Sequence, residues 1–274
     1  WFSMDDNSNG VDSTVGLAEQ DQLKPIRKRA YCESEEPESC QKLDKNDYDA
    51  SDHPRVLIPE LLKQFYYLGW VTGTGGGISI KFGQEIYIAP SGVQKERVHS
   101  EDLFVLDVDG NALCTPPSFK NFKQSQCTPL FMCVYRQRNA GSVIHSHSKS
   151  SALASILYKG REFEISHLEM IKGVYNEALG RNYRYNEKLV IPIVENTCEE
   201  CDLESSFTET LNNYPNTCAI IVRRHGFYVW GASWEKAKIY CECLDYLFDM
   251  AVQMHLHGVS PVHSGCGSST RKVD

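Results

Sequence analysis

The sequence has no long hydrophobic run, and its N-terminal region lacks the apolar core of a signal peptide. No apolar stretch in the 274 residues approaches the roughly 18 residues that a membrane-spanning helix needs. The eleven cysteines also lack the regular spacing of a disulfide framework. These absences favour a cytoplasmic protein with no membrane partner.

Nucleotide-binding motifs and a basic surface are missing as well. No G-x-G-x-x-G motif follows a strand pattern and no G-x-x-x-x-G-K-[ST] motif occurs, so a nucleotide cofactor is not indicated. The net charge is −8; residues 1–50 hold 12 acidic and 6 basic side chains, which leaves only −2 for the rest of the chain. This balance argues against nucleic acid as a partner.

Composition divides the chain into three parts. Residues 1–50 are rich in Ser, Asp, Glu, Asn and Lys, so we predict a disordered acidic tail. Residues 258–274 are rich in Gly and Ser and predict a flexible C-terminal tail. Residues 51–257 are long enough to bury a sizeable core and are expected to form one domain.

The order of helical and strand patterns predicts an α/β domain, a sheet with helices packed on it. Apolar residues at Ile58, Leu61, Leu62 and Phe65 mark one face of a first helix. A second helix is expected to begin with Thr128 as its N-cap and Pro129 at its first position. The other predicted helices cover 148–158, 202–214 and 233–257, and strands are expected near 77–81, 85–90, 103–108, 142–147, 187–195 and in a pair around 223–226.

Two histidines lie two positions apart in "SVIHSH", at the end of a predicted strand. Alternate side chains of a strand share a face, so His145 and His147 point the same way, as two ligands of one metal do. His225 follows another apolar strand and precedes a glycine, and three imidazoles on strand ends are typical of a catalytic zinc site. Polar residues at a strand end are the simpler interpretation, and His167 is the main rival as a ligand.

Four further features could contribute chemistry. The loop "TGTGGGISI" and the loop "APSG" offer backbone N–H groups that could converge on a phosphate, although two tight turns explain them equally well. Glu169 lies between apolar neighbours, and a carboxylate half-shielded from water would have a raised pKa, although a glutamate on the surface of a helix is the simpler interpretation. Cys127 precedes a predicted helix, whose dipole could acidify its thiol, and packing is an equal alternative.

Taken together, these segments resemble the methylthioribulose-1-phosphate dehydratases of the class II aldolase/adducin superfamily. The resemblance extends over residues 53–256 and is carried by "TGTGGGISIK", "IYIAPSGVQKER", "SQCTPLF", "VIHSHSK", "REFEISHLEMIKG" and "AIIVRRHGFYVWG". It implies a three-layer α/β/α sandwich, usually a homotetramer with its sites between subunits.

The resemblance also implies a function. It implies a zinc enzyme of methionine salvage that dehydrates 5-methylthioribulose 1-phosphate, a phosphorylated ketose, to 5-methylthio-2,3-dioxopentyl phosphate. By this resemblance, the metal ligands are His145, His147 and His225, the acid/base residue is Glu169, and the cysteine that contacts the substrate is Cys127. The residues of the phosphate-binding loops are Gly75, Gly76, Gly77 and Ser79, together with Ser91 and Gly92.

One departure from the sugar-phosphate aldolases bears on the reaction. Those enzymes place a catalytic glutamate after a pair of serines, where this chain has Ser125, Gln126 and Cys127. The departure argues against aldol cleavage and for acid/base work by Glu169. The alternatives are another zinc-dependent sugar-phosphate aldolase or epimerase, and a scaffold with an apoptosis-regulating binding role, whose protein partner the sequence does not identify.

Overall fold

A computed structural model describes residues 52–263 of the chain, and both predicted tails lie largely outside this range. Five α-helices occur in it, α1 (Pro54–Tyr67), α2 (Thr128–Gln137), α3 (Lys149–Leu157), α4 (Glu204–Asn213) and α5 (Trp234–Leu256). The strands are β1 (Gly77–Phe82), β2 (Glu85–Ile88), β3 (Phe104–Leu106), β4 (Ala112–Cys114), β5 (Ser142–Ser146), β6 (Glu162–Ile165), β7 (Tyr175–Asn176), β8 (Arg181–Asn182), β9 (Leu189–Val194), β10 (Ala219–Val222) and β11 (Gly226–Gly231). Short 3₁₀ helices include η1 (Lys95–Arg97), η4 (Glu169–Gly173) and η6 (Glu200–Leu203).

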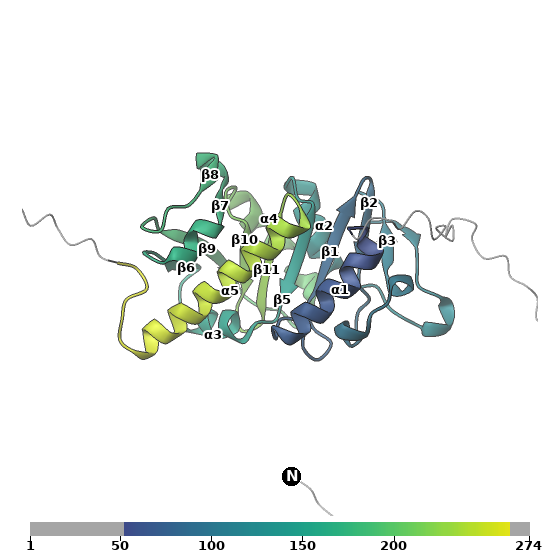
Figure 1. Cartoon of the computed structure of the whole chain (residues 1–274), viewed down its shortest axis with the longest axis horizontal. Helices are drawn as coiled ribbons and strands as arrows, with labels where there is room; N and C mark the ends of the chain where they lie inside the picture. The colour runs from purple at the N-terminus through teal and green to yellow at the C-terminus, as the bar shows by residue number, and fades with distance from the viewer. Residues whose placement is uncertain (1–51, 264–274) are drawn as a thin grey trace, which may run out of the picture. The chain divides into compact units, whose positions relative to one another are not determined.

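Nine of the strands form one sheet in the order β4-β3-β2-β1-β5-β11-β10-β9-β6 (Figure 1). Neighbouring strands are antiparallel except for β9 and β10, which run parallel. In the centre, β5 pairs with β11 so that His145 lies opposite Tyr228 and Ser146 opposite Phe227. This register places the carboxyl end of β5 beside the turn between β10 and β11, which carries His225.

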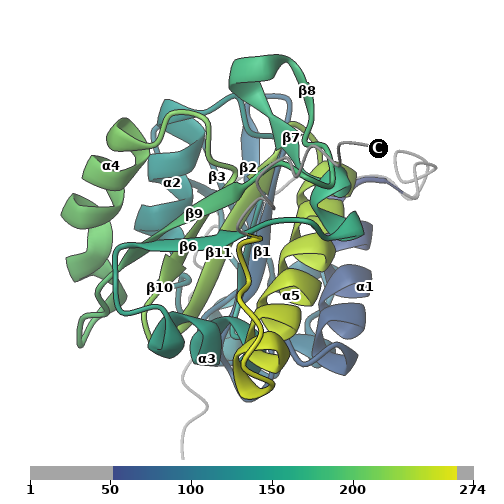
Figure 2. The ribbon, with the colours of Figure 1, turned by 90° about the vertical axis from the view of Figure 1, so that its left-hand side faces the viewer.

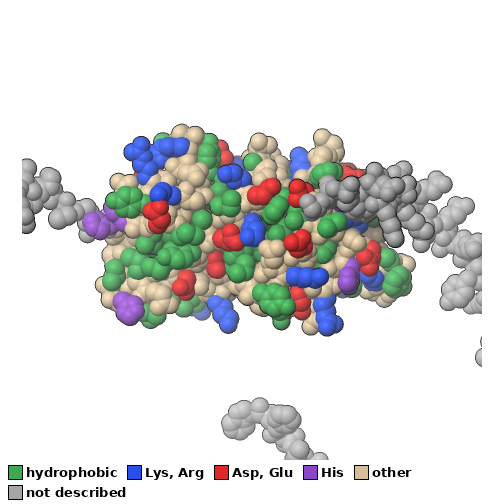
Figure 3. Space-filling model, in the orientation of Figure 1, with side chains coloured by type: hydrophobic (Ala, Val, Ile, Leu, Met, Phe, Trp, Pro, Cys, Tyr) green, Lys and Arg blue, Asp and Glu red, His purple; other side chains and the backbone are tan. Residues whose placement is uncertain are grey.

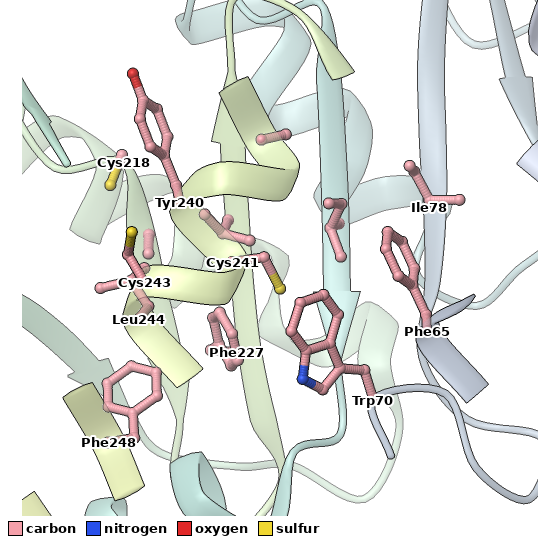
Figure 4. Packing of buried hydrophobic residues seen from close by; sticks show 14 of the residues in the cluster. Phe65, Trp70, Ile78, Cys218, Phe227, Tyr240, Cys241, Cys243, Leu244 and Phe248 are labelled. Carbon is pink, nitrogen blue, oxygen red and sulfur yellow. The ribbon is translucent and has the colours of Figure 1, made fainter. Parts of the chain in front are cut away.

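Helices cover both faces of the sheet, so the predicted three-layer α/β/α architecture is confirmed. Figure 2 shows α2 and α4 on one side and α1, α3 and α5 on the other. Successive side chains of a strand point to opposite faces of the sheet, so each strand contributes to both hydrophobic cores. In β5, Val143 packs in the cluster under α2 and α4, and Ile144 packs in the cluster under α1 and α5. Figure 4 shows the second cluster, where Phe227 of β11 packs on Phe248 of α5 with ring centroids 5.1 Å apart.

The five predicted helices are confirmed, but the start of α2 differs from its prediction. Cys127 is the N-cap residue, Thr128 is the first helical residue and Pro129 the second. The Thr128 hydroxyl is buried and caps nothing. The strands β4, β6, β7 and β8 were not predicted, because each is too short, at two to four residues, to show a clear alternation.

On the face that carries α1 and α5, acidic and basic side chains are mixed rather than gathered by sign (Figure 3). Between residues 52 and 263, no helix combines the length and the apolar character needed to cross a membrane.

The predicted C-terminal tail begins inside the described range, where the Ser166 amide donates to the Pro261 carbonyl at 3.0 Å.

Candidate metal centre and its surroundings

Three imidazoles meet where β5 ends and β11 begins. His145 is the fourth residue of β5, His147 follows that strand, and His225 lies in the turn before β11. Their Nε2 atoms form a nearly equilateral triangle, with separations of 3.0 Å for His145–His147 and His147–His225 and 3.3 Å for His145–His225. The structure therefore brings together all three histidines that the sequence predicted as metal ligands.

The triangle has the size that a tetrahedral zinc site requires. Nitrogen ligands about 2.0–2.1 Å from a tetrahedral zinc ion lie about 3.3 Å from one another. The three observed separations are close to this value. The residues therefore fit a divalent metal with a preference for imidazole, although imidazole suits several such ions.

Hydrogen bonds at the opposite ring nitrogens orient two of the imidazoles. His145 Nδ1 lies 3.1 Å from the Phe227 carbonyl oxygen, and His225 Nδ1 lies 3.1 Å from Asn196 Oδ1. Both partners are acceptors, so each Nδ1 donates and each Nε2 keeps its lone pair for a metal. His145 is further held by stacking on the Tyr228 ring, with centroids 3.9 Å apart.

Burial favours the neutral, ligand-competent form of two of the imidazoles, those of His147 and His225. Burial and the charges of His145 and His225 lower the pKa of His147 to about 3. Burial and the charge of His145 lower the pKa of His225 to about 4. Neutral imidazoles bind metals, so these two residues do not need to lose protons at neutral pH before they bind an ion.

The glycine loop packs directly against this triangle. A Cβ atom on Gly75 would lie 2.3 Å from Nδ1 of His147, and one on Gly76, whose φ is +69°, would lie 2.9 Å from the His145 carbonyl oxygen. No side chain fits at either position without moving a metal ligand. The absence of a side chain at these two glycines therefore leaves the space that His145 and His147 occupy, whether or not the loop also binds a ligand.

Sequence reasoning missed a carboxylate at the fourth corner of the site. Oε1 of Glu200, in η6, lies 3.3 Å from Nε2 of His145 and 3.4 Å from Nε2 of His225. Among residues 52–263, Glu200 and the three histidines form one group whose ligand atoms all lie within 4.8 Å of one another. Burial alone would raise the pKa of Glu200, but hydrogen bonds to His145 and Cys127 and nearby imidazole charge lower it to about 2.

A topological signal for this corner was present in the sequence. Parallel strands end at the same edge of a sheet, and β9 and β10 are the parallel pair. Asn196 and Glu200 follow β9, as His225 follows β10. Recognising that pair would have placed the segment "ENTCEE" beside His225.

Cys127 reaches the site, and of the two interpretations that the sequence left open, an acidified thiol and a packing residue, the structure favours packing. Its side chain is buried, and burial together with the charge of Glu200 raises the pKa of the thiol. The loss of hydration outweighs the dipole of α2, so the thiol keeps its proton. Glu200 and Tyr228 both act on or respond to this thiol electrostatically, so it lies next to the candidate metal ligands as a neutral group.

Glu169 does not meet the metal cluster within one chain. It begins η4, its side chain is 75% exposed, and it pairs with Lys172. In a single chain the structure therefore favours a surface glutamate over a carboxylate shielded from water. The rival ligand His167 also lies outside the cluster, with its ring 4.5 Å from that of His263.

The predicted phosphate-loop residues divide into two sets. Ser79 is fully buried, and its hydroxyl is paired with that of Tyr135 at 2.9 Å, so Ser79 belongs to the core and not to a ligand site. Ser91 and Gly92 lie at the surface, and the Ser91 amide donates to the Lys123 carbonyl at 2.9 Å. The glycine loop and the Ser91–Gly92 loop therefore remain as the candidates for phosphate.

Replacing Glu200 by Gln should weaken zinc binding by about tenfold or more while leaving the fold intact. Gln keeps the size of the side chain but removes the negative charge beside His145 and His225. Zinc affinity can be measured by competition with a chromogenic chelator. Glu199→Gln is the matched control, because its side chain is exposed and outside the cluster. Equal zinc affinity in both variants would remove Glu200 from the metal site.

Comparisons with known proteins agree with this geometry. Residues 56–252 match the family model of the Class II Aldolase and Adducin N-terminal domain. The chain is 61% identical over 209 residues to the methylthioribulose-1-phosphate dehydratase of Xenopus laevis, covering 76% of this chain and 87% of that protein. It is 56% identical over 230 residues to the human protein of that name, covering 84% and 94%.

Solved structures support the fold. An L-fuculose 1-phosphate aldolase superimposes with a TM-score of 0.62 at 17% identity, covering 79% of this chain and 92% of that one. YgbL of Escherichia coli, described as a putative aldolase/epimerase/decarboxylase, gives 0.55 at 19% identity, covering 76% and 91%. The chain thus belongs to the class II aldolase and adducin family and, within it, to the methylthioribulose-1-phosphate dehydratases.

Proposed function

We propose that this protein is a zinc-dependent hydro-lyase that converts 5-methylthioribulose 1-phosphate to 5-methylthio-2,3-dioxopentyl phosphate. The observation that carries the proposal is the triangle of His145, His147 and His225, whose Nε2 separations suit a tetrahedral zinc ion. The high sequence identity to the methylthioribulose-1-phosphate dehydratases supports the choice of substrate. The reaction would serve methionine salvage in the cytoplasm.

The histidines, the carboxylate and the thiol have separate tasks. When bound, zinc supplies Lewis-acid polarisation of the C2 carbonyl of the ketose. The hydrogen bonds to Phe227 and Asn196 hold the imidazoles in the orientation that keeps the ion in place. Cys127, a buried neutral thiol beside Glu200, lines the site and contacts the substrate.

Glu169 is the proposed proton carrier. It takes the C3 proton and delivers one to the departing C4 hydroxyl, so one molecule of water leaves and the resulting enol becomes the 2,3-diketone. In one chain Glu169 is exposed and stands apart from the metal cluster. We therefore propose a homotetramer in which Glu169 of one copy completes the site of another.

Turnover of methylthioribulose 1-phosphate by the purified, zinc-loaded protein tests the function. Diketone formation supports dehydration. Formation of two shorter fragments would indicate aldol cleavage, and a changed sugar of equal mass would indicate an epimerase. A zinc-occupied protein that transforms no ketose phosphate would instead point to a scaffolding role.

A further inference from the structure

A lysine lies buried between the two candidate phosphate loops. Lys95 begins η1 and is only 2% exposed. Its ammonium donates to the Thr74 carbonyl at 2.8 Å and approaches the Val93 carbonyl at 3.5 Å. Thr74 belongs to the glycine loop, and Val93 follows Ser91 and Gly92, so one ammonium group joins both loops.

This ammonium has no ionic partner in the described structure. No carboxylate of residues 52–263 lies within 4.0 Å of it, and its only hydrogen-bond acceptors there are the two carbonyl groups. A buried charge without a counter-charge is costly, and an ammonium has three donors, of which at most two are used here. Burial lowers the pKa of Lys95, whereas Cys127 and Glu200 act in the opposite direction. A destabilising charge at such a place suggests a functional reason for it.

The position of Lys95 relates that charge to the metal centre. A Cβ atom on Gly77 would lie 3.8 Å from Cε of Lys95, so the lysine stem runs beside the start of β1. Gly77 is paired in the sheet with the metal ligand His145. The lysine side chain therefore passes close to the start of β1, the strand that pairs with β5 at His145.

We propose that Lys95 is the positioning residue for phosphate recognition: its ammonium holds the two loops together and supplies the positive charge that sets their affinity for the phosphate group of the substrate. This inference rests on the proposed function only for the identity of the substrate. It concerns the phosphate group, which can be tested with inorganic phosphate and without turnover.

The test compares phosphate binding in Lys95→Met and in the wild type. Calorimetry and the phosphate-induced rise in melting temperature of the zinc-loaded protein are the two readouts. We expect at least tenfold weaker phosphate binding in Lys95→Met, with unchanged zinc content. In phosphate-free buffer the variant should be at least as stable as the wild type, because an unpaired buried ammonium is replaced by an apolar chain.

Two further variants separate charge from structure. Lys95→Gln keeps an amide donor for the carbonyls but has no charge, so it should lose phosphate binding as Lys95→Met does. Lys63→Met removes a solvent-exposed lysine of α1 in place of the buried one, and this variant should bind phosphate normally. Wild-type phosphate affinity in Lys95→Gln, or destabilisation and zinc loss in both Lys95 variants without phosphate, would overturn the proposal.

Turnover separates failure of this inference from failure of the proposed function. If the wild type dehydrates the ketose phosphate, Lys95→Gln should raise KM at least tenfold and change kcat much less. If the wild type binds phosphate through Lys95 but does not dehydrate the substrate, the inference holds and the proposed function fails. If the wild type is an active dehydratase and the Lys95 variants keep its KM, the function holds and the inference fails.

Discussion

Purified His145→Ala protein should contain almost no zinc and should show no measurable dehydration of methylthioribulose 1-phosphate. His145 is fully buried, and its Nε2 lies within 3.3 Å of those of His147 and His225 and of Oε1 of Glu200. Its loss removes one ligand from the centre of the group and leaves a cavity beside Tyr228. Metal content by atomic emission and turnover by diketone formation are the measurements.

The control for this variant is His257→Ala. His257 caps the end of α5, is exposed, and lies outside the metal cluster, so zinc content and turnover should equal those of the wild type. A folded His145→Ala protein with full zinc occupancy would disprove the ligand assignment. Circular dichroism of both variants distinguishes loss of metal from loss of fold.

Glu169→Gln should keep its zinc and lose turnover by a factor on the order of 10² to 10⁴, the usual contribution of general acid–base catalysis. The side chain is 75% exposed in one chain and pairs with Lys172, so its neutralisation should hardly change stability. Turnover and zinc content are measured on the same preparation. Glu101→Gln is the control, because Glu101 is another exposed glutamate paired with a lysine. Activity near that of the wild type in Glu169→Gln would remove it from the reaction.

Mixing the two inactive variants tests whether the site lies between copies of the chain. If Glu169 of one copy serves the metal of another, assemblies of His145→Ala and Glu169→Gln subunits contain some sites with both residues intact. Coexpression should then restore a measurable fraction of the wild-type turnover. Coexpressed subunits that assemble together and stay inactive would place Glu169 in the same chain as its metal, or outside the reaction.

Local patterns were sufficient for the helices, for seven of the nine strands of the large sheet and for the three candidate metal ligands. The alternation of a strand puts His145 and His147 on one side, and a glycine after His225 predicts a turn at a strand end. These features depend on spacing within a few residues. A histidine triad built on strand ends could therefore be predicted as a candidate metal site, and the structure brings its three members together.

Only tertiary structure determined the groups around the ligands. Glu200 and Asn196 reach the histidines because β9 and β10 are parallel neighbours, and Lys95 is buried because two loops close over it. For Cys127 the sequence left acidification at a helix end and packing as equal alternatives, and the structure decides for packing by removing the thiol from water. Sequence periodicity determines which side chains share a face; how deeply a charge is buried, and what lies opposite it, depends on segments far apart in the chain.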